Sequence, residues 1–64
     1  MTVLYKYGRY EVTTCPDVED GTKTVNGYGV FNTETGVREY SSVALHDCVK
    51  LARLYELLLR DALS

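Results

Sequence analysis

The sequence has 64 residues, of which 45% are apolar and 25% charged, and its formal net charge is −2. This length allows one small domain (residues 1–64), and the composition is that of a folded protein and not of a disordered chain. So small a net charge provides no long-range field to attract phosphate backbones, and it is too weak for a mimic of DNA.

The first predicted element is a β-hairpin over residues 3–14 with Gly8-Arg9 as its turn. Glycine at the first turn position suits a type II′ turn, whose twist matches two antiparallel strands. This pairing sets Lys6 opposite Glu11 as an ion pair, and it sets Val3 opposite Thr14. One face of the hairpin is then apolar and contains Val3, Tyr5, Tyr7, Tyr10 and Val12. The alternative is a single strand with a glycine bulge.

A loop over residues 15–23 and a second hairpin follow. Pro16 ends the strand ladder, and Asp20-Gly21 is a turn signal. Residues 24–32 and 36–41 read as antiparallel strands joined by a type I turn with Gly36 in the left-handed position. Gly27 and Gly29 alternate on one face, which indicates the close approach of the helix, of the partner sheet or of a ligand.

The hydrophobic period becomes helical from residue 42 to about residue 63. Ser41 and Ser42 are candidate N-caps, and the Asp47 carboxylate is favoured near the positive helix end. The stripe expected to face the sheet contains Leu45, Cys48, Ala52, Tyr55, Leu59 and Ala62. Arg53, Glu56 and Arg60 are expected together on the polar side.

The helix has more leucines than one sheet face can cover. The surplus cluster consists of Leu51, Leu54, Leu57 and Leu58. Scattered surface leucines need no explanation, but clustered ones favour a second apolar contact. The second contact is either a helix pair in a homodimer or the surface of another protein. We expect a homodimer that uses these leucines or an exposed strand edge, and we also expect a protein partner.

These elements predict an α+β fold, with an antiparallel β-meander of three or four strands and one C-terminal amphipathic helix packed on one sheet face. The order is βββα or ββββα, depending on whether residues 2–14 form one bulged strand or a hairpin of two. No internal repeat or linker divides the chain.

The sequence contains no catalytic signature, and we expect no enzyme, no metal site and no cofactor. His46 and Cys48 are two residues apart and do not face each other on a helix. Three carboxylates in residues 17–20 lack the EF-hand pattern and read as a solvated turn. Cys15 and Cys48 are expected as reduced thiols, although a bond between them is geometrically conceivable.

We expect a small protein-protein interaction module. The chain is rich in tyrosines and in surplus helix leucines, and it lacks a catalytic signature. Tyrosine is enriched at protein interfaces. The candidate partner-binding residues are Leu51, Leu54, Leu57, Leu58, Tyr28, Tyr40 and Arg38. In size and style the chain is similar to the accessory or inhibitory proteins of phages and mobile elements, an analogy that rests on no particular residue.

Two other functions stay open. A nucleic-acid-binding regulator would use Arg9, Arg38 and the sheet tyrosines, but the basic residues form no stripe, so this reading is not favoured. A small enzyme or metal-binding module is the third reading. We expect no membrane segment, because no stretch is long and apolar enough and Met1–Tyr5 lacks the pattern of a signal peptide. The expected location is the cytoplasm.

Overall fold

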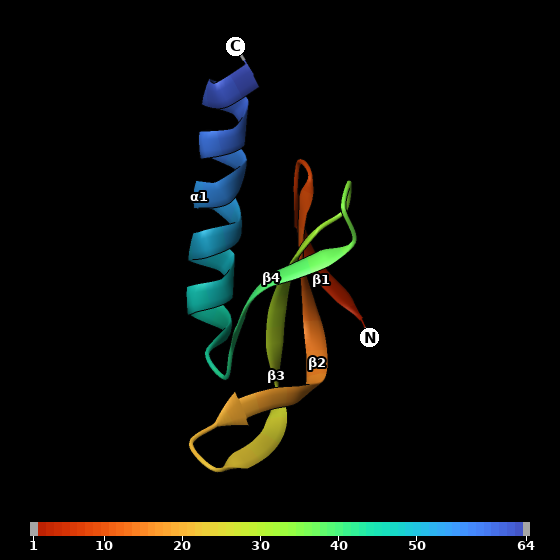
Figure 1. The fold of residues 1–64 in the computed structure, drawn as a ribbon, viewed down its shortest axis with the longest axis vertical. Helices are drawn as coiled ribbons and strands as arrows, with labels where there is room; N and C mark the ends of the chain where they lie inside the picture. The colour runs from red at the N-terminus through yellow and green to blue at the C-terminus, as the bar shows by residue number, and fades with distance from the viewer. Residues whose placement is uncertain (1, 64) are drawn as a thin grey trace.

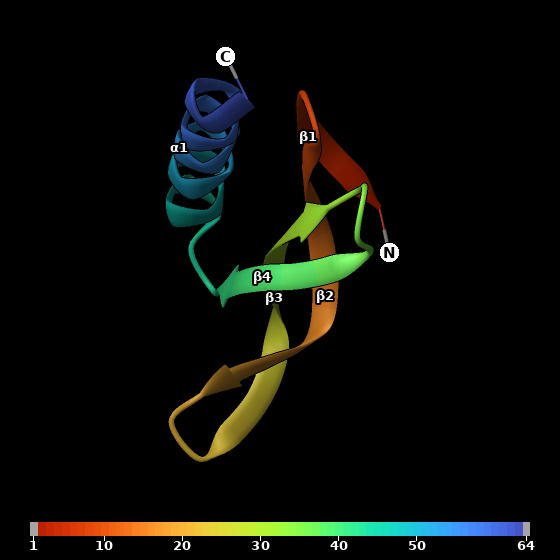
Figure 2. The same ribbon diagram turned by 45° about the horizontal axis from the view of Figure 1, so that its top comes forward.

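The computed structural model describes residues 2–63, which form one antiparallel sheet and one helix. Strands β1 (Val3–Tyr7), β2 (Tyr10–Asp20), β3 (Lys23–Asn32) and β4 (Val37–Ser42) lie side by side in chain order. Helix α1 (Leu45–Leu63) packs on one face of this sheet (Figure 1). The predicted α+β meander is therefore confirmed in its four-stranded form, ββββα. The molecule measures 41 × 19 × 17 Å and is elongated because the β2–β3 hairpin extends past one end of α1 (Figures 1 and 2).

The β1–β2 hairpin has the turn that the sequence predicts. Gly8 has a φ of 59°, in the left-handed region, whereas Arg9 has a negative φ. This combination is that of a type II′ turn. Beside the turn Tyr7 lies opposite Tyr10 and Lys6 lies opposite Glu11 in the strand register, as expected. The predicted Lys6–Glu11 ion pair is not among the ion pairs of residues 2–63.

The predicted register is wrong beyond Tyr5. The pairing shifts between Val3 and Tyr5, so Val3 lies opposite Thr13 and not opposite Thr14. A bulge at Leu4 adds one residue to β1, and one extra residue turns the following side chains to the other sheet face. Val3 consequently leaves the predicted apolar face and lies beside Thr13 and Phe31 on the face away from α1.

The predicted loop over residues 15–23 is wrong, because both strands continue through it. Strand β2 runs to Asp20 and β3 begins at Lys23, so that only a tight turn at Gly21, with a φ of 64°, separates them. Pro16 lies where the register shifts between Cys15 and Val18. A bulge tolerates a residue without a backbone N–H, so the proline bends the strand without ending it.

The β3–β4 turn agrees with the prediction. Gly36 has a φ of 73°, and its N–H donates to the carbonyl of Asn32 at 2.8 Å. The Asn32 side-chain Oδ1 accepts the N–H of Glu34 at 2.9 Å, which fixes the turn from within.

Gly27 and Gly29 allow parts of the same chain to approach closely. A Cβ at Gly27 would lie 2.8 Å from the carbonyl oxygen of Ser42, and one at Gly29 would lie 2.8 Å from the Cys15 Sγ and from the Arg38 Cδ. A close approach is therefore present at both glycines, but the atoms that approach belong to β2 and β4 of the same sheet and not to the helix, a partner sheet or a ligand as expected. The sheet consequently curls on its face away from α1, which buries Cys15.

The helix starts three residues later than predicted. Ser42 still belongs to β4, and α1 begins at Leu45. The Ser42 hydroxyl accepts the N–H of Ala44 at 3.0 Å, so it supports the turn into the helix. Asp47 lies in the first turn, as expected for a carboxylate near the positive helix end.

The core lies between α1 and the sheet. Its completely buried members are two valines, Val12 and Val30, and two small helix residues, Cys48 and Ala52. Each buried valine contributes about 2 kcal/mol to folding. Tyr10 is also buried, and half-buried side chains surround this centre, namely Tyr7, Tyr28, Tyr40, Leu45, Val49, Tyr55 and Leu59.

The predicted inner stripe of the helix is confirmed except at its end. Ala62 is exposed because the last turns of α1 extend beyond the sheet (Figure 1). Leu63 is exposed for the same reason.

Candidate functional site

The outer face of α1 carries a cluster of leucines. We call Leu51, Leu54, Leu57 and Leu58 the leucine face. Their spacings of three, four and seven residues place them next to one another on the helix surface. Leu54, Leu57 and Leu58 are 45%, 55% and 57% exposed, and Leu51 is half-buried. The leucine face is therefore an exposed apolar patch on a regular element, as the sequence predicts.

Two shallow hollows lie along one side of the leucine face. The first is lined by His46, Val49, Lys50, Arg53, Leu54 and Leu57. The second lies where α1 meets the β1–β2 turn and is lined by Tyr7, Gly8, Arg53, Glu56, Leu57 and Arg60. Arg53 and Leu57 line both, so the two hollows adjoin and form one groove along the helix.

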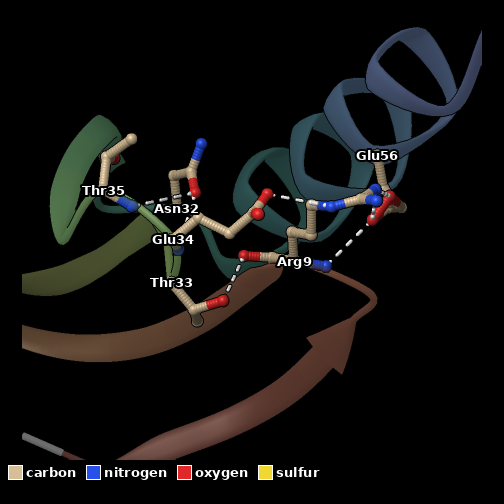
Figure 3. Close-up of polar contacts among 6 residues, drawn as sticks. All are labelled: Arg9, Asn32, Thr33, Glu34, Thr35 and Glu56. Atoms are coloured by element: carbon tan, nitrogen blue, oxygen red, sulfur yellow. Dashed lines mark hydrogen bonds and ion pairs between the residues drawn. The ribbon is translucent and has the colours of Figure 1, made fainter. Parts of the chain in front are cut away.

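Arg9 and Glu56 join the β1–β2 turn to the helix (Figure 3). The Arg9 backbone N–H donates to the Glu56 Oε1 at 2.9 Å, and the Arg9 Nη1 lies 3.4 Å from the same oxygen. The Glu56 side chain is only 6% exposed, so this carboxylate is buried and paired. The expected position of Glu56 on the polar side is wrong: it lies on the inner face, one helical turn after Ala52.

Arg9 also holds the β3–β4 turn (Figure 3). Its Nε lies 2.9 Å from the Glu34 Oε1, and its carbonyl accepts the Thr33 N–H and hydroxyl at 2.8 and 2.9 Å. Arg9 thus connects three segments that are distant in the sequence. Sequence reasoning missed this connection, although the spacing of four residues between Ala52 and Glu56 indicates a shared helix face.

The remaining candidate residues do not lie on the leucine face. Tyr28 and Tyr40 are half-buried and pack against the core on the sheet face that α1 covers. Arg38 lies on the opposite sheet face and reaches Asp17 with two hydrogen bonds of 2.7 and 3.1 Å. The structure therefore groups the four leucines but places the tyrosines and Arg38 elsewhere.

The cysteines and the histidine form no reactive pair. Cys15 and Cys48 are both free and buried, so the bond between them that the sequence left open is absent. Burial raises the pKa of the Cys48 thiol, which keeps it protonated and unreactive. His46 is exposed, and residues 2–63 contain no group of three or more side chains placed to hold a metal ion.

Comparison with protein-family models, with curated proteins and with solved structures finds no match to this chain. In the described part of the chain, no helix combines the length and the apolar character needed to cross a membrane.

Proposed function

We propose that this protein is a small protein-protein interaction module that uses the leucine face of α1. The observation that carries the proposal is the apolar area that α1 leaves exposed on its outer face. The inner face already packs its own apolar stripe against the sheet, and Leu54, Leu57 and Leu58 lie exposed on the opposite side. Exposed apolar clusters of this kind are typical of surfaces that bind another protein.

In this proposal the module modulates a larger partner by occupying part of its surface, as accessory or inhibitory proteins of phages and mobile elements do. A cytoplasmic location fits two free buried thiols, because reducing compartments keep cysteines unpaired. A second copy of the chain is the other candidate occupant of the leucine face, which would make the protein a homodimer.

The nucleic-acid alternative has less support. It needs Arg9 and Arg38, and each guanidinium already forms an ion pair with a carboxylate of the same chain. It also needs several exposed sheet tyrosines for base stacking, whereas Tyr28 and Tyr40 pack against the core and, among the tyrosines of residues 2–63, only Tyr5 is exposed.

Affinity purification from native cell extract tests the proposal, with Leu54→Glu and Leu57→Glu as disrupting variants. Thr24→Glu is the matched control, because it adds the same charge at an exposed position far from the leucine face. Thr24 lies in the part of the β2–β3 hairpin that extends past one end of α1, which we call the arm. We expect one partner to be retained by the wild type and by Thr24→Glu, resistant to nuclease, and lost from both leucine variants. Circular dichroism checks that the variants stay folded.

The other outcomes separate the alternatives. Loss of the bound material on nuclease treatment identifies a nucleic-acid ligand. Recovery of the chain alone, together with a dimer mass that Leu57→Glu reduces to a monomer, identifies a homodimer. Retention of the partner by folded Leu57→Glu contradicts the assignment of the binding surface.

A further inference from the structure

The leucine face has a basic flank. Lys50, Arg53, Leu57 and Arg60 follow one another at spacings of three and four residues, which places them in one stripe along α1. The three cations are exposed. Within residues 2–63 none of them forms an ion pair, whereas Arg9 and Arg38 each bind a carboxylate. The free cations of the helix are therefore gathered beside its exposed leucines, and the expectation that the basic residues form no stripe is wrong for α1.

This stripe coincides with the groove described above. Arg53 and Leu57 line both hollows, Lys50 lines one and Arg60 the other. Apolar side chains of a docked segment would enter the hollows, and their acidic neighbours would meet the cations at the rim. The outer carboxylates of α1, Asp47 and Asp61, lie in its first and last turns. The Glu56 carboxylate also lines the second hollow, but it is buried and paired with Arg9, so the cations of the stripe are the unpaired charges in the middle of the groove.

From this arrangement we infer that the groove beside Leu57 binds an acidic amphipathic helix of another protein. The inference rests on the proposed function and adds the chemistry of the partner. The groove would recognise a helix that has apolar residues at helical spacing and Asp or Glu residues on their flanks. Charge complementarity would raise the association rate and the specificity of this binding.

A second copy of the chain fits this groove poorly. An antiparallel pair centred near residue 55 places Lys50 of one copy against Arg60 of the other, and a parallel pair places Arg53 against Arg53. Both arrangements bring like charges together, which disfavours association. An anionic membrane surface is also disfavoured, because nine acidic and seven basic residues make the whole protein negative.

An unbiased selection tests the inference. The purified full chain is used to select binders from a displayed library of random peptides long enough to form several helical turns. We expect the enriched peptides to have apolar residues at helical spacing with Asp or Glu beside them. Their binding is then measured with Leu57→Glu, Arg53→Glu and Arg53→Lys. Lys23→Glu is the control that makes the same charge change on the distant arm.

The expected pattern is specific. Leu57→Glu abolishes binding, Arg53→Glu weakens it at least about tenfold and more steeply at low salt, and Lys23→Glu leaves it unchanged. Arg53→Lys retains most of the affinity, because the charge is kept.

Each contrary result has a distinct meaning. Loss of binding in Leu57→Glu without an effect of Arg53→Glu, or enrichment of peptides without acidic residues, overturns the acidic partner and leaves the leucine face as a binding surface. Absence of any binder, or binding that neither substitution affects, overturns both proposals. Binding to vesicles of phosphatidylserine and phosphatidylcholine that Arg53→Glu abolishes, without peptide enrichment, assigns the groove to a membrane. Self-association that Leu57→Glu abolishes assigns it to a second copy.

Discussion

The inner and outer faces of α1 both carry large apolar side chains, but only those of the inner face pack against the sheet. The fully buried centre of the inner face is small, Cys48 and Ala52, and larger side chains such as Tyr55 and Leu59 are half-buried around it. Small central residues let the helix lie close to the sheet, and tyrosines from the strands provide much of the volume of the core. The exposed leucines of the outer face, Leu54, Leu57 and Leu58, lie outside this core.

The largest expected effect comes from placing the same charge on each face. Ala52→Asp should unfold the protein, because an unpaired buried charge costs several kcal/mol and a small domain has only about 5 kcal/mol of stability. Leu58→Asp should leave the fold intact, with a loss of about 0.5 kcal/mol from weaker helix propensity. Circular dichroism during thermal and urea unfolding measures both. If Leu58→Asp unfolds the protein, the leucines of the outer face are needed for folding, and the predicted difference between the two faces is wrong.

A second pair of variants, Gly8→Ala and Gly21→Ala, tests the contact between Arg9 and Glu56, the charged residue of the inner face. Gly8 and Gly21 both have positive φ angles, 59° and 64°, but a Cβ at Gly8 would overlap the Glu56 carboxylate, whereas one at Gly21 would meet nothing. We expect Gly21→Ala to cost about 1 kcal/mol through backbone strain alone. Gly8→Ala should cost about 1–3 kcal/mol more, because the carboxylate must leave the Arg9 N–H.

Urea unfolding of the two alanine variants measures this difference directly. Equal losses of stability in Gly8→Ala and Gly21→Ala would mean that the Arg9–Glu56 contact contributes nothing, and that the inner face is held by apolar packing only.

The two faces of α1 also differ in how well the sequence predicts them. The helical period identifies the inner apolar stripe and leaves Leu54 and Leu57 outside it, and the structure confirms both. It misplaces Glu56, because an acidic side chain is assigned to solvent unless its partner is known, and Arg9 lies forty-seven residues away. The candidate binding set mixes both sheet faces because strand faces depend on bulges. Val30 pairs with Tyr40 but Phe31 pairs with Arg38, so one extra residue in β4 places Tyr40 and Arg38 on opposite faces, and no local signal in the sequence indicates it.

In the strands too, features set by neighbouring residues are predictable from the sequence, and features set by distant pairing are not. Gly8 and Gly36 specify their turns locally, so both hairpins near them are predictable. Gly21 likewise marks the turn between β2 and β3, as the sequence predicts, whereas Pro16 looks like a local break and β2 continues through it. Pairing of β2 with β3 outweighs the proline once a bulge accommodates it.

The smallest effect is expected for the Arg38–Asp17 ion pair, which lies on the sheet face away from α1. There Arg38 donates two hydrogen bonds to Asp17, at 2.7 and 3.1 Å, and these bonds lower the pKa of the Asp17 carboxyl. A lowered pKa in the folded state adds stability above the ordinary value near 3.8, and this stability is lost as the pH falls through the lowered value. The pair lies in water and contributes little.

We therefore expect Asp17→Asn to lower the melting temperature slightly at pH 7, and the difference from the wild type to vanish as the pH falls below the Asp17 pKa. Glu19→Gln is the control, since Glu19 is exposed on the same arm and forms no ion pair within residues 2–63. Thermal unfolding across this pH range gives the answer. If the difference in melting temperature between Asp17→Asn and the wild type stays constant with pH, the Arg38–Asp17 pair does not stabilise the arm. Its stability then comes from groups that do not titrate, namely the β2–β3 backbone pairing and the packing of Val18 against Gly27.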